Sequence, residues 1–151
     1  MRISFWILFA YVLYRAGRLA NRRERIIFLG RAVLSVLISL AMTALIAYFY
    51  WRARPFAALG FDPLIFKSAL DKSFPSDHAV TASSLATILF LYHKNSGYWG
   101  IAAAVLIGLG RVLAGVHYVS DVLAGAGLGV LAALIVFKIS ANASGRIHDG
   151  R

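Results

Sequence analysis

Long uncharged runs of apolar residues, separated by short polar stretches, dominate the chain. Residues 32–51 form one such run of 20 residues, and a helix needs about 20 apolar residues to cross a hydrocarbon core about 30 Å thick. Three shorter runs reach spanning length once their flanking residues are included: 79–92, 96–110 and 122–137. Leu, Ala, Ile and Val fill the runs without alternation at period 2, so the pattern predicts helices and not barrel strands.

The first apolar run, residues 3–14, follows Arg2 and has the length of a signal-peptide core. A basic stretch comes after it, and not the small-residue cleavage site of a signal peptide. We therefore interpret it as a retained helix and predict an all-α fold, a polytopic transmembrane helical bundle with about five spans. In this interpretation residues 1–151 form a single membrane-embedded domain with a polar tail at residues 140–151.

The composition fits a membrane protein, because 60% of the residues are hydrophobic and only 15% are charged. The formal net charge of +10 suggests nucleic-acid binding, but five arginines lie in one segment, residues 15–25, between two apolar runs. The positive-inside rule explains that cluster better, so we predict no nucleic-acid partner. The sequence has no cysteine, which excludes disulfides and cysteine-ligated metals and leaves the redox compartment open.

The positions of the basic residues predict one orientation in the membrane. If residues 15–25 are cytoplasmic, five spans place Lys94 and Lys138 on the same side and segments 52–78 and 110–121 on the other. We therefore predict a protein integral to the cell (inner) membrane, with these two segments on the outer, periplasmic face. Ionisable residues at membrane depth are costly and are functional candidates by default, and most candidates in this chain share that face.

The strongest local signal lies in residues 110–121, where Arg111, His117 and Asp121 interrupt an apolar stretch. His117 and Asp121 are four positions apart, so in a helix or turn the carboxylate can hold one ring nitrogen and leave the other free as a nucleophile. A purely structural interpretation is also open. In that case Arg111 extends its charge to the interface, Asp121 caps the last helix and His117 is merely interfacial.

A second signal, Pro75-Ser76-Asp77-His78, directly precedes the run at residues 79–92 and is typical of a helix start. Free backbone N–H groups at such a start bind anions. An imidazolium at His78 can protonate a leaving group beside them. The alternative is a plain capping sequence with Ser76 or Asp77 as the cap.

The third signal is the pair Arg52 and Arg54, followed by Pro55, just after the run at residues 32–51. A guanidinium there can hold a phosphate through two hydrogen bonds, although arginines at a membrane edge are also common without such a role. All three signals gather on one face. Together they provide a phosphate pocket, a nucleophile and an acid.

These residues resemble the type 2 phosphatidic acid phosphatase superfamily, whose signatures are Lys-x6-Arg-Pro, Pro-Ser-Gly-His and Ser-Arg-x5-His-x3-Asp. The resemblance covers residues 54–121, nearly half of the chain. The third signature is met at Arg111, His117 and Asp121 with both spacings intact, and Gly110 stands in place of its serine.

The other two signatures are matched less completely. Asp77 replaces the glycine between Ser76 and His78, and the position seven before Arg54 is Ala47 instead of lysine. Arg52 is the nearest candidate to supply the missing charge. With Asp77 in the second signature, the chain looks like the bacitracin-resistance type of undecaprenyl-diphosphate phosphatase. The family usually has six spans, whereas this chain offers five.

The resemblance implies a role for each residue. His117 attacks phosphorus, His78 protonates the leaving oxygen and Asp121 orients His117. The phosphate-binding set is Arg54, Arg111, Ser76, Asp77 and Arg52. Family members need no metal and no cofactor, and the few acidic residues of this chain do not cluster in sequence as a divalent-metal site requires.

The leading hypothesis is hydrolysis of undecaprenyl (prenyl) diphosphate to the monophosphate and phosphate through a phosphohistidine intermediate. The expected partners are this lipid substrate and the membrane lipids, and the sequence leaves the oligomeric state open. The enzymatic alternative is a phosphatase for phosphatidic acid or phosphatidylglycerol phosphate, against which Asp77 counts. A non-enzymatic membrane subunit or transporter explains the hydropathy but not the spacings.

Overall fold

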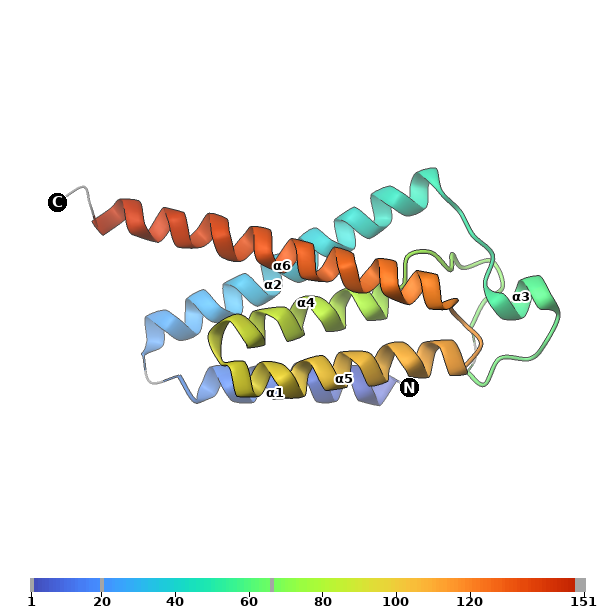
Figure 1. The fold of residues 1–151 in the computed structure, drawn as a ribbon, viewed down its shortest axis with the longest axis horizontal. Helices are drawn as coiled ribbons and strands as arrows, with labels where there is room; N and C mark the ends of the chain where they lie inside the picture. Colours follow the sequence, from blue (N-terminus) through green and yellow to red (C-terminus); the bar gives the residue numbers. More distant parts are fainter. Residues whose placement is uncertain (1, 20, 66, 149–151) are drawn as a thin grey trace.

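The computed structural model describes residues 2–19, 21–65 and 67–148, which form a bundle of helices (Figure 1). The helices are α1 (Arg2–Gly17), α2 (Arg22–Phe49), α3 (Pro55–Leu59), α4 (Asp77–Tyr92), α5 (Lys94–Leu113) and α6 (Val119–His148). The described residues contain no strand, so the predicted all-α class is confirmed.

Each predicted apolar run coincides with one long helix, and only the run at residues 32–51 extends past its helix end, by two residues. Within the described chain, three helices are long and apolar enough to cross a membrane: α2, α5 and residues 119–141 of α6. Helices α1 and α4 have 16 residues each. At 1.5 Å per residue they rise about 24 Å, less than a hydrocarbon core of about 30 Å. The predicted five spans therefore correspond to five long helices, of which three meet the spanning requirement.

Helix α2 begins ten residues before the apolar run that predicts it. The side-chain oxygen of Asn21 caps this helix by accepting a hydrogen bond from the backbone N–H of Arg23 at 2.9 Å. Glu24 lies in the first turn, where a negative charge is favourable. The end of the basic cluster is therefore helical, and Arg25 Nη2 closes the α1–α2 turn by donating to the carbonyl of Leu19 at 3.1 Å.

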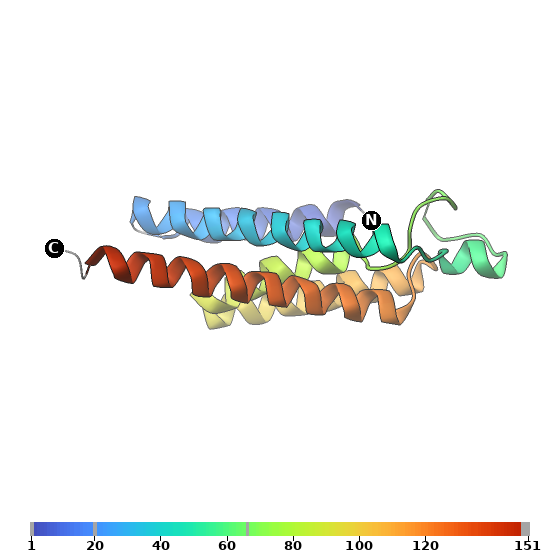
Figure 2. The same cartoon turned by 90° about the horizontal axis from the view of Figure 1, so that it is seen from above.

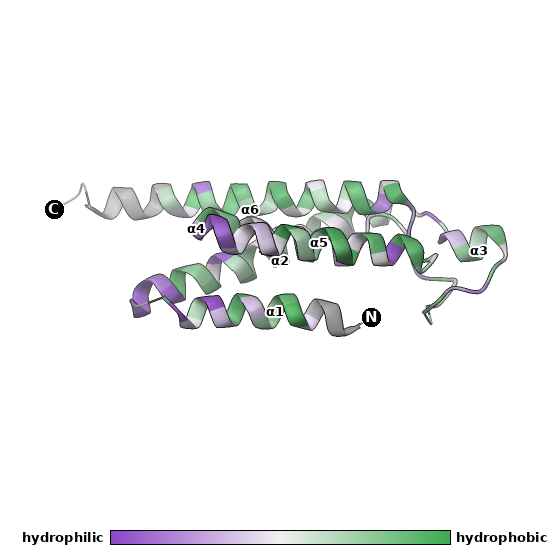
Figure 3. Ribbon diagram, turned by 60° about the horizontal axis from the view of Figure 1, so that its bottom comes forward, coloured by the Kyte–Doolittle hydropathy of each residue, from purple (hydrophilic) through white to green (hydrophobic). Residues whose placement is uncertain are grey.

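Helix α4 lies in the centre of the bundle and contacts α1, α2, α5 and α6. After its first turn its sequence is apolar apart from small serine and threonine side chains, which suits a helix in the interior, and Val80, Ala82 and Ile88 are fully buried. Figure 2 shows α1 and α2 on one side of the bundle and α5 and α6 on the other. The outward side chains of these outer helices are apolar, as Leu37 and Leu131 are, so the bundle presents a hydrophobic belt (Figure 3).

Small residues bring α6 close to α4. A Cβ at Gly129 would lie 2.2 Å from the carbonyl oxygen of Val80, and one at Gly125 would lie 2.7 Å from that of Ser76. Gly125 and Gly129 therefore allow α6 to pack closely on α4. Gly127, in contrast, faces open space.

The two ends of the bundle differ in chemistry (Figures 1 and 3). The α1–α2 turn with its arginines and the α4–α5 junction with Lys94 lie at one end. Helix α3, the loop from α3 to α4 and the α5–α6 connection lie at the opposite end. The three polar signals of the sequence therefore converge at the end away from the basic cluster.

Candidate active site

The α5–α6 connection directs His117 into the protein, where its side chain is only 4% exposed. The connection turns at Gly115, whose φ of +72° lies in the left-handed region that favours glycine. Gly115 also accepts a hydrogen bond from the backbone N–H of Phe56 at 3.2 Å, and Ala114 accepts one from Leu64 at 3.2 Å. These bonds fix the start of α3 and its following loop on the turn that carries His117.

The hydrogen bonds of His117 define which ring nitrogen is available. Its Nδ1 lies 2.8 Å from the backbone carbonyl oxygen of Ser73. A carbonyl can only accept, so Nδ1 carries the proton, and in the neutral ring Nε2 then carries the lone pair. This lone pair accepts a hydrogen bond from Nη1 of Arg54 at 3.3 Å, a group that is predicted to bind phosphate.

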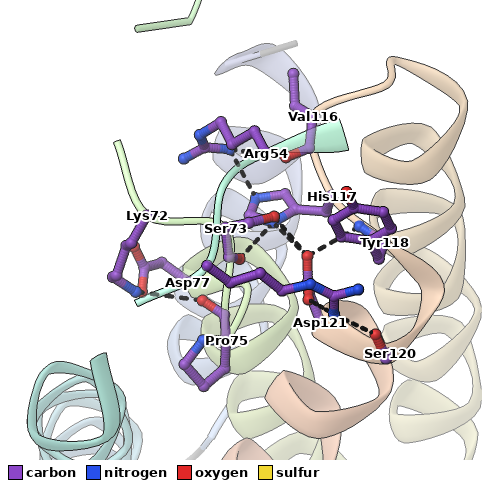
Figure 4. A network of polar contacts seen from close by, with 11 residues as sticks. Arg54, Lys72, Ser73, Pro75, Asp77, Val116, His117, Tyr118, Ser120 and Asp121 are labelled. Carbon is purple, nitrogen blue, oxygen red and sulfur yellow. Dashed lines mark hydrogen bonds and ion pairs between the residues drawn. The ribbon is translucent and has the colours of Figure 1, made fainter. Parts of the chain in front are cut away.

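Asp121 is fully buried and acts on His117 largely through Ser73 (Figure 4). Its Oδ2 accepts hydrogen bonds from Ser73 Oγ at 2.6 Å and from the backbone N–H of Tyr118 at 2.9 Å. The same oxygen lies 3.7 Å from His117 Nδ1, beyond hydrogen-bond distance. The spacing of four residues predicts a direct hydrogen bond between Asp121 and the His117 ring. In the structure, the ring instead donates its short hydrogen bond to the Ser73 carbonyl.

Ser73 is the residue that joins His117 to Asp121 in this network, and no role for it was predicted from the sequence. Its hydroxyl binds Asp121, its carbonyl binds His117, and its backbone N–H donates to the carbonyl of Arg52 at 2.9 Å. These partners are between 21 and 48 positions away in sequence. The only local signal is a serine two residues before Pro75, which spacing alone does not distinguish from a loop residue.

Arg52 is bound to the α6 side of the site. Its Nη1 donates to Ser120 Oγ at 2.8 Å and to Asp121 Oδ1 at 3.0 Å, and its guanidinium lies 3.7 Å from the centre of the Tyr118 ring. In this arrangement the charge of Arg52 balances that of Asp121. Its predicted role as replacement for the missing lysine stays a prediction.

Arg54 and Arg111 are buried, with 5% and 4% exposure, and their donors are incompletely paired. Arg54 Nη1 donates to the carbonyl of Val116 at 2.9 Å. Among the described residues, five buried side-chain atoms lack a partner, and four of these belong to the site: Arg54 Nε, Arg111 Nε, Arg111 Nη2 and Ser76 Oγ. An unpartnered buried donor is costly, and this set can bind the acceptor oxygens of a ligand.

The second signal forms the start of α4, as predicted, with Ser76 as its N-cap residue. The backbone N–H of Ser76 donates to the carbonyl of Asp121 at 3.1 Å, which joins this start to α6. The carboxylate of Asp77 is 52% exposed and pairs with Lys72 at 2.8 Å, so Asp77 faces outward while its backbone lies in the first turn. His78 follows in that turn and is partly buried.

The electrostatic surroundings keep His117 neutral. Burial lowers its pKa below the ordinary value of about 6.5, and the positive charges of Arg54 and Arg111 lower it further, against the opposing effect of Asp121. A neutral ring near pH 7 is the nucleophilic form. In the described part of the chain, no three His, Asp or Glu side chains lie together as metal ligands.

Comparison with protein families matches residues 28–144 to the PAP2 superfamily. The chain belongs to this superfamily. The family resemblance inferred from the three signatures is thereby confirmed, and PAP2 membership places the chain in a family of membrane lipid phosphatases.

Three PAP2 relatives illustrate the match. The chain is 33% identical over 135 residues to the bacitracin transport permease protein BcrC of Bacillus licheniformis, covering 89% of this chain and 65% of that protein. It is 28% identical over 118 residues to the undecaprenyl-diphosphatase BcrC of Bacillus subtilis (strain 168), covering 78% of this chain and 59% of that protein. Its fold is similar to a crystal structure of a PAP2 type phosphatidylglycerolphosphate phosphatase from Bacillus subtilis, with a TM-score of 0.64, 27% identity and coverage of 91% and 70%.

Lys67 is a cation near the PAP2 site that no sequence signal identified. Ile65, two residues before it, packs on the cluster that includes Ala114 in the α5–α6 connection. Burial lowers the pKa of Lys67, and the nearby positive charges of Arg54 and Arg111 lower it further. The PAP2 signature lysine is absent at position 47, and Lys67 joins Arg52 as a candidate to take its place.

Proposed function

We propose that this PAP2 protein hydrolyses a prenyl diphosphate, undecaprenyl diphosphate, to the monophosphate and phosphate through a phosphohistidine intermediate. One observation carries the proposal. Two buried arginines and Ser76 carry four unpartnered polar atoms, and Arg54 Nη1 lies 3.3 Å from the unprotonated Nε2 of His117. Donors of this kind stabilise the oxygens of a phosphoryl group as charge develops on them.

The proposed reaction has two steps. His117 Nε2 attacks the terminal phosphorus, the bond from phosphorus to the bridging oxygen breaks, and a protonated His78 gives a proton to the prenyl monophosphate that leaves. In the substrate-free site burial, and next the positive charge of Arg111, lower the pKa of His78 to about 4. The negative charge of the bound diphosphate raises that pKa and favours the protonated ring. Water then attacks the phosphohistidine and gives a proton back to His78, the P–N bond breaks, and phosphate departs. The Ser73 carbonyl and the Asp121 carboxylate face Nδ1, where they stabilise the positive ring of the intermediate.

The proposed substrate rests on the names of relatives and on the second signature. An undecaprenyl-diphosphatase is among the relatives, and Asp77 in the second signature favours the same class. The phosphatidylglycerolphosphate phosphatase among the similar structures supports the alternative of a monophosphate phospholipid. We further propose that the site lies on the outer face of the cell membrane, because it is at the end of the bundle opposite the arginine cluster.

The first prediction concerns substrate class and metal dependence. Purified protein in detergent with a chelator should release inorganic phosphate from undecaprenyl diphosphate, and do so faster than from phosphatidic acid or phosphatidylglycerol phosphate. The measurement is the initial rate on each substrate at matched surface concentration. A reversed preference supports the monophosphate alternative, loss of activity in chelator contradicts a metal-free mechanism, and no release at all supports the non-enzymatic alternative.

The second prediction asks which cation replaces the PAP2 lysine. A charge-assisted hydrogen bond contributes about 1.5 to 3 kcal/mol, so Arg52→Ala should lower kcat/KM about tenfold to a hundredfold. The loss should be equal on short-chain and long-chain substrates, because the group acts at the phosphate end. Lys67→Ala is the matched variant, since Lys67 has only a loose ion pair with Asp71 at 3.8 Å. A larger loss in Lys67→Ala would assign the role to Lys67, and unchanged short-chain kinetics in Arg52→Ala would make Arg52 a lipid anchor.

A further inference from the structure

An apolar groove of about 640 Å³ runs along the bundle between α5 and α6, with α4 as its floor. It exists because α5 and α6 each pack on α4 much more extensively than on one another. Small side chains on all three helices widen it. Its lining includes Ala86, Phe90, Ala104, Leu109, Ala126 and Leu134.

The wall of this groove offers almost no hydrogen bonds to a ligand. Among the described lining residues only Ser83 and Thr87 have polar side chains, and both hydroxyls are bonded within their own helix. Ser83 Oγ donates to the carbonyl of Ala79 at 2.7 Å, and Thr87 Oγ1 donates to that of Ser83 at 2.8 Å. The groove therefore suits a hydrocarbon and excludes a polar headgroup.

One end of the groove lies near the candidate active site. Ala79, which follows His78, and Val119 and Val122, which flank Asp121, form its end near the site. On α6 the lining continues to Leu134, 15 residues after Val119, which is about 22 Å along a helix at 1.5 Å per residue. A hydrocarbon chain can thus lie in the groove along most of the bundle, with one end near the site.

We propose that this groove holds the hydrocarbon chain of the substrate and that its occupant is a single prenyl chain. This inference rests on the proposed function, since it places the headgroup at His117. A lipid tail is as apolar as the groove wall, so entry from the bilayer gains little from the hydrophobic effect. The gain comes from orientation, because a chain confined to one channel points its headgroup at the nucleophile. One channel accepts one chain, whereas a phospholipid would leave its second chain outside.

The test narrows the groove from each side. Ala104→Trp on α5 and Ala126→Trp on α6 place an indole in the channel, and Leu131→Trp on the lipid-facing side of α6, where Leu131 is 47% exposed, is the matched control. We expect both groove variants to lower kcat/KM for undecaprenyl diphosphate tenfold to about a hundredfold, the scale of a misplaced substrate. Hydrolysis of dimethylallyl diphosphate, whose chain is one prenyl unit, should stay within about twofold of wild type in all three variants.

Two results would overturn the groove as the chain site: equal losses on both substrates in folded variants, or no loss on the long one. A fall in oligomer mass with unchanged chain-length dependence would instead show a second copy of the protein in the groove.

If neither tryptophan variant folds, wild-type protein can be labelled with a photoreactive prenyl diphosphate. Labels should fall within residues 101–112 and 122–134, and labels on α2 would contradict the proposal. Hydrolysis of dimethylallyl diphosphate by wild type tests the proposed function separately.

Discussion

His117→Ala should lower kcat about a thousandfold or more on every phosphate substrate, because it removes the atom that we propose bonds to phosphorus. Nε2 is the ring nitrogen left unprotonated by the Nδ1 bond to Ser73, and it lies 3.3 Å from Nη1 of Arg54. The measurement is single-turnover phosphate release in detergent.

The matched control for this prediction is His93→Ala. His93 is exposed at the α4–α5 junction, at the far end of the bundle from the site, so its loss should leave kcat unchanged. Circular dichroism and gel filtration of both variants should match wild type. A folded His117→Ala protein that keeps more than a few per cent of wild-type activity would remove His117 from the role of nucleophile.

Arg111→Ala should cause the second large loss. Its Nε and Nη2 are buried without a partner, and two charge-assisted hydrogen bonds of about 1.5 to 3 kcal/mol each correspond to about a hundredfold to ten-thousandfold in kcat/KM. Arg111→Lys retains the charge and loses the planar fork, so it should recover part of the activity.

The stability of the substrate-free protein separates this role from a structural one. Arg111→Ala removes a buried cation whose donors are not fully paired, so the thermal midpoint should stay the same or rise. A large fall in that midpoint together with the activity loss would indicate that Arg111 holds the fold. Wild-type kcat/KM in Arg111→Ala would exclude it from phosphate binding.

Much of the fold was predictable because its determinants are local. The apolar runs mark the helices, Ser76 marks the start of α4, and the arginine cluster marks the end of the bundle away from the site. Hydrophobic length and capping chemistry depend on neighbouring residues, which a sequence shows directly. The start of α2 was missed because Asn21 caps a charged segment that lies outside the apolar run.

The details of the site were less predictable because they depend on contacts between distant residues. Ser73 binds His117 across 44 positions and Asp121 across 48, and no spacing rule connects these residues. Lys67 lies near the arginines only because its loop packs on the α5–α6 connection. The groove likewise follows from how α5 and α6 both pack on α4, which neither helix sequence shows alone.

The most direct test of the account is to trap the phosphorylated enzyme. Purified protein in a buffer with a chelator is mixed rapidly with prenyl diphosphate that is labelled in its terminal phosphate, and the reaction is quenched with alkali. We expect an acid-labile phosphate on His117, which peptide mass spectrometry can locate. The label should form and decay at rates consistent with turnover and be absent from His117→Ala. A phosphate on another residue, or full turnover without any phosphoenzyme at millisecond times, would contradict catalysis through His117.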